Sequence, residues 1–388
     1  MMAGETEAEK QGGGSRCKLW HGDSDEDIAA AAEALRMGKA VAFPTETVYG
    51  LGALASDDAA VMRIFAAKGR PADNPLIVHF ADGQAGLEAC AEGGQVPSTA
   101  RRLAEAFWPG PLSICIRANK ETVSERARAG LDTVAVRVPD HPIALKLLRA
   151  LGKYVGVAAP SANASGRPSP TQAEHVLCDL GDRIEGVVDG GKTCSVGLES
   201  TVIDCTVDPP VILRPGKISR EEIQAVLGLP VMDYQHSAEV TTEEAVKERP
   251  KAPGMKYRHY APRAGVTVVE GSAALFVQSV LAKLEEADEA DSHGRAWLGV
   301  MAPQDILEEL RRSGGEKLRQ CVLAACGDSV SDQSSIARDL FAVLRSFDEM
   351  PDVTDILAHG TEAKGLGKAI RNRLDKAALR SDLDPNKS

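Results

Sequence analysis

The chain is poor in aromatic residues and lacks long apolar runs. Phenylalanine, tryptophan and tyrosine make up only 4% of its 388 residues, which weighs against the aromatic stacking surfaces of many RNA-binding modules. No apolar run reaches the length of a membrane span. We therefore expect a soluble protein without membrane contact.

Cysteine clusters and targeting signals are also missing. None of the eight cysteines belongs to a Cys-x-x-Cys pair or to a Cys/His cluster with zinc spacing, so a reducing compartment fits best. The first twenty residues lack the apolar core of a signal peptide and the arginine-rich, acid-poor composition of a transit peptide. We expect a cytoplasmic protein with a disordered tail over residues 1–22.

A basic excess is absent as well. The formal net charge is −11, and neither the last third of the chain nor the rest has the surplus of lysine and arginine that drives sequence-independent binding to a phosphate backbone. Any cationic site must therefore be local.

The most informative stretch is residues 39–80. Its pattern predicts a buried strand at 40–43, a polar turn, an amphipathic helix, a loop holding Lys68, Arg70 and Asn74, and an apolar strand at 76–78 ending at His79. Two cations and an amide on one loop offer donors for an oxyanion such as a phosphate. A solvated basic loop is the alternative, and composition alone favours it.

Helical and strand patterns alternate along the first two thirds of the chain. Predicted helices cover 24–38, 98–107, 143–151 and 170–180, and another begins at Ser219. Predicted strands cover 112–116, 133–138, 154–159, 186–189, 201–205 and 210–213, and a glycine-rich loop covers 83–94. Ser169 and Gln172 form a helix-capping pair, so a structural role for Ser169 competes with ligand contact.

The pattern restarts after residue 264. Strands at 266–269, 296–301, 321–325 and 355–358 alternate with helices at 272–287, 304–312 and 334–347, which predicts a small, mainly parallel α/β domain. The predicted organisation is a tail (1–22), a first domain (23–230), a linker (231–264), a second domain (265–380) and a tail (381–388).

A series of motifs resembles the threonylcarbamoyl-AMP synthases of the YrdC-like family, in the family's order. They are Pro44-Thr-Glu-Thr-Val-Tyr-Gly-Leu51, Lys68-Gly-Arg-Pro-Ala-Asp-Asn-Pro-Leu76, Trp108–Leu112, Gly130–Arg137, Ala159–Asn163, Glu199–Thr201, Leu213–Gly216 and Ala252–Pro262. The ending Gly367–Leu374 resembles the family's long form more weakly. The resemblance implies a YrdC-like twisted mixed sheet with a concave site, followed by a smaller Rossmann-like α/β domain.

The resemblance also implies an activity. Members condense L-threonine, bicarbonate and ATP, used with Mg²⁺, into threonylcarbamoyladenylate and release pyrophosphate. The product then passes to a separate tRNA threonylcarbamoyl transferase complex, as the first step of a tRNA modification. Adenylyl transfer of this kind asks a protein mainly for positioning and charge neutralisation.

The family's motifs assign eleven site residues, and the linker adds Tyr257 as a further ATP contact. For ATP the motifs imply Lys68, Arg70, Asn74, Thr133, Ser161, Ser169 and Arg214, with Lys68 and Arg70 also catalytic. For L-threonine they imply Thr47, His79, Arg137 and Ser200. Without the resemblance, Arg137 would be read as an exposed strand arginine and His79 as a structural histidine. Tyr257 belongs to the linker segment 252–262, expected to close over the site as a lid.

The sequence weighs against two other functions. An RNA-binding or ribosome-associated module of the same fold is disfavoured by the net charge and by the scarcity of aromatic residues. A weak contact of the enzyme itself with RNA stays open. A carbamoyl-transferring enzyme of the same fold would bring an acylphosphatase-like segment and zinc-spaced cysteines, and the chain has neither. No Ser-His-Asp or Cys-His arrangement stands out, so we expect substrate-assisted chemistry without a covalent intermediate.

Overall fold

A computed structural model describes residues 17–191, 194–234, 250, 252, 260–288 and 297–379. Tyr257 and most of the expected linker lie outside these residues, as does most of each expected tail. None of the helices in the described ranges combines the length and the apolar composition needed to span a bilayer.

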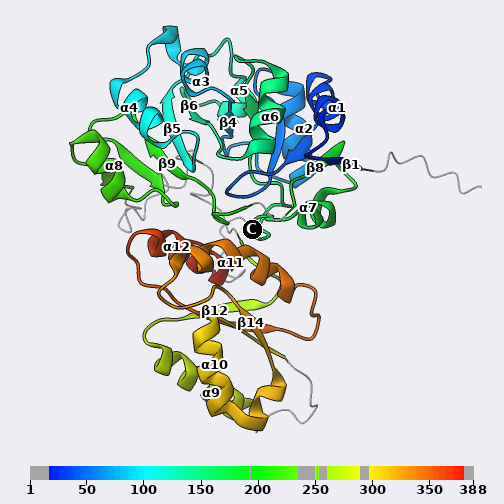
Figure 1. Ribbon diagram of the computed structural model, residues 1–388, viewed down its shortest axis with the longest axis vertical. Coiled ribbons are helices and arrows are strands. Elements are labelled where there is room, and N and C mark those ends of the chain that lie inside the picture. Colours follow the sequence, from blue (N-terminus) through cyan, green and yellow to red (C-terminus); the bar gives the residue numbers. More distant parts are fainter. Residues whose placement is uncertain are drawn as a thin grey trace, which may run out of the picture.

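The larger part of the molecule is built on a mixed sheet, which Figure 1 shows in its upper half. Its eleven strands in the described residues are β1 (Lys18–His21), β2 (Val41–Phe43), β3 (Gly50–Leu54), β4 (Ile77–His79), β5 (Leu112–Arg117), β6 (Thr133–Arg137), β7 (Val157–Ala158), β8 (Gly186–Asp189), β9 (Thr201–Asp204), β10 (Val211–Arg214) and β11 (Met232–Asp233). Their spatial order is β1-β8-β2-β3-β7-β4-β6-β5-β9-β10-β11. Parallel and antiparallel pairs are mixed, as expected.

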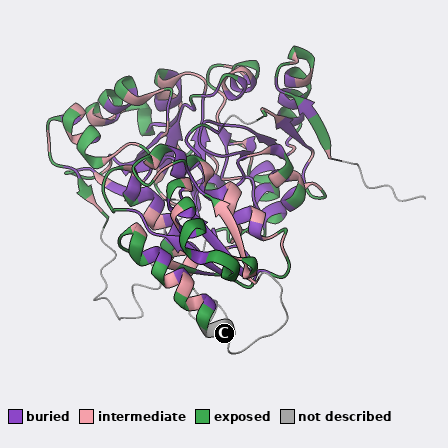
Figure 2. Cartoon of the chain, turned by 60° about the horizontal axis from the view of Figure 1, so that its bottom comes forward, coloured by how far each residue is buried: buried purple, intermediate pink, exposed green. Residues whose placement is uncertain are grey.

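Helices cover both faces of this sheet. They are α1 (Asp25–Arg36), α2 (Asp58–Lys68), α3 (Gly83–Cys90), α4 (Ser98–Phe107), α5 (Glu125–Arg128), α6 (Pro142–Leu151), α7 (Ala173–Leu180) and α8 (Arg220–Leu227). Side chains alternate between the faces of a strand. Val41 and Phe43 therefore join α1 and α6 in one core, whereas Ala42 joins α2 and α4 in another. Figure 2 shows buried residues concentrated in the sheet and on the inner sides of the helices.

Several boundaries differ from the sequence predictions. The expected tail is too long, because Lys18–His21 forms β1 beside β8 and buries Trp20. The polar turn predicted after the strand at 40–43 is followed by a strand that was not predicted: Gly50–Leu54 is β3 and pairs with β2 and β7. The predicted glycine-rich loop is mostly helix α3, which Asp82 caps through its side chain.

The predicted cap of α7 is also wrong. This helix begins at Ala173, and Gln172 at its N-cap position makes no side-chain capping bond. The Ser169 hydroxyl instead donates to the Glu199 carboxylate. The helices predicted from Ser24 and Ser219 are both capped by these serines: the Ser24 hydroxyl accepts from the Asp27 backbone N–H, and Ser219 with Glu222 makes a complete capping box.

The smaller part of the molecule is an α/β domain with four parallel strands. Its elements are β12 (Gly265–Val269), α9 (Ala273–Asp288), β13 (Leu298–Ala302), α10 (Gln304–Gly314), β14 (Cys321–Ala325), α11 (Gln333–Phe347), β15 (Asp355–His359) and α12 (Leu366–Ala378). The strand order is β12-β15-β13-β14, and every pair is parallel. The predicted parallel domain is confirmed.

Helices α11 and α12 face the larger domain (Figure 1). Gly197 lies against α11 with φ +74, and a Cβ built on it would be 2.4 Å from Arg338 Cα and 2.5 Å from the Ala337 carbonyl oxygen. Because both neighbours are backbone atoms, no rotamer change would relieve such a contact. The two domains therefore meet at backbone distance here.

This contact predicts a large effect of Gly197→Ala on stability. Gly228→Ala is the matched control, because Gly228 also has a positive φ, +63, but has nothing within 4 Å of its Cβ position. We expect the control to lose roughly 1–2 kcal/mol, the cost of left-handed backbone, and Gly197→Ala to lose clearly more. Denaturant unfolding of both variants measures the difference. Equal losses would show that the domains are not held at this point.

Candidate active site

A hollow of about 610 Å³ lies where several strands of the large sheet end. Its walls come from the turn after β2, the ends of β4 and β6, the loop after β7, the segment before β9 and the end of β10. The polar residues that line it are Thr45, Thr47, Arg70, His79, Arg137, Ser161, Asn163, Glu199, Ser200, Arg214 and Tyr260. Three arginines from separate segments thus meet at one hollow.

The structure brings most of the predicted site residues to this hollow. Those that line it are Thr47, Arg70, His79, Arg137, Ser161, Ser200 and Arg214. Lys68, Asn74 and Ser169 are buried and lie outside its lining. Thr133 begins β6 while Arg137 ends it, so about 13 Å of extended strand separates the two residues. Thr133 therefore stays a prediction, and Tyr257 lies outside the described residues.

His79 and Arg137 stand side by side at the ends of the parallel strands β4 and β6. Burial, and then the charge of Arg137, lower the pKa of His79 to about 3. The imidazole is therefore neutral at physiological pH. A neutral histidine offers a substrate one donor and one acceptor without adding charge.

Arg137 is held from two sides. Its Nε donates to the Gly110 carbonyl oxygen at 3.2 Å, and its Nη2 lies 2.7 Å from Oε1 of Glu46. Both members of this ion pair are buried. We did not predict a role for Glu46, although the available signal was its position between two threonines directly after a buried strand. The pair fixes the guanidinium at the edge of the hollow.

Arg214 and Ser200 form a second fixed pair. Arg214 donates to the Ser200 carbonyl oxygen at 3.1 Å from Nε and 3.0 Å from Nη2, and its Nη2 also donates to the Ser200 hydroxyl at 3.2 Å. The hydroxyls of Ser113 and Ser200 lie 2.8 Å apart. The backbone and the side chain of Ser200 are therefore both set by neighbours.

The prediction that Lys68 lies on a loop is wrong. Lys68 is the last residue of α2. Its ammonium donates to the carbonyl oxygens of Ser161, at 2.6 Å, and Asn163. Burial, followed by the charge of Arg70, lowers the pKa of Lys68 well below its usual value. In this arrangement Lys68 shapes the loop that presents Ser161.

Asn74 carries a different signal. It is 0% exposed, and neither its side-chain oxygen nor its side-chain nitrogen has a hydrogen-bond partner within the described ranges. An unsatisfied buried amide costs about 1–3 kcal/mol and is rare in native proteins. Because Asn74 is fully buried and outside the lining of the hollow, its contact with ATP stays a prediction.

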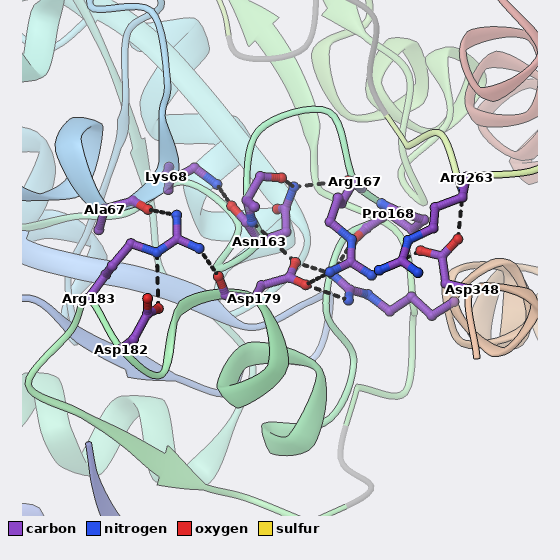
Figure 3. A network of polar contacts seen from close by, with 12 residues as sticks. Ala67, Lys68, Asn163, Arg167, Pro168, Asp179, Asp182, Arg183, Arg263 and Asp348 are labelled. Carbon is purple, nitrogen blue, oxygen red and sulfur yellow. Dashed lines mark hydrogen bonds and ion pairs between the residues drawn. The ribbon is translucent and has the colours of Figure 1, made fainter. Parts of the chain in front are cut away.

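A polar network connects the wall of the hollow to the smaller domain (Figure 3). The Asn163 amide donates to the Arg167 carbonyl oxygen at 2.9 Å. Arg167 bridges Asp179 and, at 2.9 Å, Asp348 of the smaller domain. Arg345 on α11 reaches across to the same Asp179 at 2.8 Å. The loop after β7 is therefore anchored to both domains.

The hollow offers little to a metal ion. No group of three His, Cys, Asp or Glu side chains in the part of the chain that the structure describes could hold one. The carboxylate that lines the hollow belongs to Glu199, which already accepts from Ser169 and Arg373. A Mg²⁺ ion in this hollow would be held mainly by oxygen atoms of a bound substrate and by water.

Comparisons with known proteins match this chain along nearly its whole length. Residues 33–216 match the family described as "Telomere recombination", and residues 218–379 match "Threonylcarbamoyl-AMP synthase, C-terminal domain". The threonylcarbamoyl-AMP synthase of Bacillus subtilis is 44% identical over 355 residues, which cover 92% of this chain and 94% of the relative. The chain belongs to the threonylcarbamoyl-AMP synthase family.

Two comparisons with Pyrococcus abyssi extend the match to a solved structure. The threonylcarbamoyl-AMP synthase of this organism is 47% identical over 352 residues, covering 90% of this chain and 94% of the relative. The crystal structure of P. abyssi Sua5 complexed with L-threonine is similar with a TM-score of 0.77 and 44% identity, covering 93% of this chain and 96% of that one. The expected fold, a YrdC-like mixed sheet followed by an α/β domain, is confirmed.

The neutral state of His79 predicts a pH effect on stability. Below pH 6.5 the unfolded chain binds a proton at this histidine, whereas the folded chain does not until about pH 3. Between pH 7 and pH 4 the wild type should therefore lose about 3 kcal/mol of unfolding free energy that His79→Gln does not lose. Denaturant titrations at both pH values measure it. If the unfolding free energies of the wild type and His79→Gln fell equally between pH 7 and pH 4, His79 would take up a proton in the folded protein as readily as in the unfolded chain.

Proposed function

We propose that the hollow synthesises L-threonylcarbamoyladenylate from L-threonine, bicarbonate and ATP and releases pyrophosphate. Membership of the threonylcarbamoyl-AMP synthase family makes the chain an enzyme of threonylcarbamoyl-AMP synthesis. The observation that carries the finer assignment is the meeting of Arg70, Arg137 and Arg214 at one hollow, since the substrates bring a carboxylate, a bicarbonate and a triphosphate.

The threonine subsite comprises Thr47, His79, Arg137 and Ser200. The solved relative from P. abyssi that is complexed with L-threonine supports a threonine site in this fold. Arg137 would bind the substrate carboxylate while Glu46 keeps the guanidinium oriented. The neutral imidazole of His79 would bind a polar group of threonine and leave the charge balance to Arg137.

The ATP subsite comprises Arg70, Asn74, Ser161, Ser169 and Arg214. Arg70 and Arg214 would neutralise phosphate charge, and the unsatisfied amide of Asn74 would gain a partner. Lys68 supports this site through the loop of Ser161, and its direct phosphate contact stays a prediction, as do the contacts of Thr133 and Tyr257. Mg²⁺ accompanies ATP, and bound Mg²⁺ neutralises phosphate charge.

The chemistry needs positioning more than a protein nucleophile. The amine of threonine attacks the carbon of bicarbonate, forms a carbon–nitrogen bond and loses water, which leaves a carbamate. A carbamate oxygen then attacks the α-phosphorus of ATP, and pyrophosphate leaves with the electron pair of the broken bond. Arginines held rigidly by Glu46 and by Ser200 lower the cost of bringing these anions together.

The product would be consumed by a transferase that moves the threonylcarbamoyl group to tRNA. A reducing compartment such as the cytoplasm is proposed for the reaction, because all eight cysteines are free and lie in described ranges. The chain itself needs no tRNA contact for this step. Pyrophosphate release that requires both threonine and bicarbonate tests the proposal directly. Tight tRNA binding without such release would support the RNA-binding module instead.

The threonine subsite predicts a selective defect in Arg137 variants. Arg137→Met would leave Glu46 buried without its partner, so we expect the double variant Arg137→Met, Glu46→Gln to be better folded. In the double variant the KM for threonine should rise about tenfold to a hundredfold, with a much smaller change for ATP. Initial rates of pyrophosphate release at varied substrate concentrations measure both constants.

The matched control is Arg117→Met. Arg117 is exposed and lies on the neighbouring strand β5, opposite Thr133 and away from the hollow. This variant should keep both KM values. An equal rise of both constants in the Arg137 variant would place Arg137 outside the threonine subsite.

A further inference from the structure

We propose that Arg373, on the last helix of the smaller domain, is a positioning residue for the active site in the larger domain. It holds together the two chain segments that present Ser200 and Arg214 to the substrates. This inference rests on the proposed function of the hollow. It gives the smaller domain a supporting part in the reaction.

The side chain of Arg373 reaches from the smaller domain into the larger domain. It lies on α12, is 0% exposed, and does not line the hollow. Its Nε donates to Oε2 of Glu199 at 3.0 Å, and its Nη1 donates to the Pro215 carbonyl oxygen at 2.7 Å. Its Nη2 also lies 3.4 Å from the Glu199 carbonyl oxygen. One guanidinium thus bridges two segments of the larger domain.

The two bridged residues are chain neighbours of the site residues. Glu199 directly precedes Ser200, and Pro215 directly follows Arg214. A shift of either anchor would therefore move a predicted substrate contact. Glu199 also accepts the hydroxyl hydrogen of Ser169, so a third predicted contact depends on the orientation of the same carboxylate.

The site needs an arginine at this position. Three acceptors of the larger domain lie around one planar group, and a fork of fixed N–H directions can reach all of them. Lysine would offer a single ammonium. The guanidinium carbon also lies over the Tyr260 ring, 5.7 Å from its centre, and Tyr260 itself lines the hollow and packs on Phe341 of α11. Cation–π contacts of this kind are made more often by arginine than by lysine.

Loss of Arg373 would raise the pKa of Glu199. The charged or titratable groups acting on it are Arg373 and Lys376 of the smaller domain, Arg214 and Lys68 of the larger domain, and Tyr260. Burial alone would raise the pKa of Glu199, but Arg373 and then Arg214 hold it below its usual value. Without Arg373 the carboxylate should take up a proton at higher pH.

A purely structural role makes different predictions. The domains are also joined by Arg345, which pairs with Asp179, so α12 is not the sole attachment. If Arg373 merely docked the domains, its loss would lower stability and leave the KM values and the pH profile of the folded enzyme unchanged. A positioning role requires both to change.

The experiment compares Arg373→Met, Arg373→Lys and Arg371→Met in the full chain. Arg371 lies two positions earlier on α12 and pairs with Asp375 and Glu270 of its own domain, which makes it a matched control. Pyrophosphate release and product formation are followed against threonine, ATP and pH. Millimolar guanidinium is added to Arg373→Ala as a chemical rescue.

We expect Arg373→Met to lose on the order of tenfold to a hundredfold in kcat/KM, with the low-pH limb of activity moved to higher pH. Arg373→Lys should recover little, guanidinium should restore part of the rate, and Arg371→Met should behave as the wild type. Unchanged KM values and pH profile in Arg373→Met would overturn the inference.

A second variant covers the case in which Arg373→Met does not fold. Glu199→Gln keeps the shape of the side chain and should show the loss in kcat/KM without the pH-dependent limb. If Glu199→Gln is fully active, the inference is wrong even though the enzyme works. If the wild type itself forms no product, the proposed function fails instead, so the two failures are distinguishable.

Discussion

The structure depends on the requirement that charges removed from water must be paired. Four arginines are buried at or near the hollow, and each has a fixed acceptor: Glu46 for Arg137, the Ser200 carbonyl for Arg214, Asp179 for Arg345 and Glu199 for Arg373. An unpaired buried charge would cost several kcal/mol, so these pairs tolerate few alternative arrangements. The requirement that keeps the charges buried also keeps the site rigid.

Two of these pairs cross between the domains. Asp179 and Glu199 belong to the larger domain, whereas Arg345 and Arg373 come from α11 and α12. Each acidic partner in turn contacts a segment next to the hollow, Asp179 through Arg167 and Glu199 through Ser169. The smaller domain therefore supports the site without lining it, except where Tyr260, at the domain junction, reaches the hollow.

Helices and strands were predicted well from the sequence where the pattern of apolar residues was regular. The parallel strands of the smaller domain were found because apolar runs alternate there with amphipathic helices, and β14 agrees at both ends. Strand β3 was missed because its segment was included in the predicted polar turn, although the missing side chain of Gly52 leaves room for the Phe43 ring, 2.8 Å from a Cβ built at Gly52. Lys68 was assigned to a loop, although it is the last residue of its helix. Contacts such as Arg373 to Glu199 join residues 174 positions apart, and no local pattern encodes them.

The position of α12 also bears on how the protein is made. Helix α12 (Leu366–Ala378) carries Arg373, which lies 174 positions after Glu199 in the chain, so α12 is synthesised well after the segment that it contacts. The larger domain emerges and folds first, and Glu199 then still lacks its partner Arg373. During that interval a buried carboxylate lacks its main partner, and the segment before β9 has no clamp. The pocket thus reaches its final form only after α12 has been made and has docked, which delays substrate binding until both domains are present.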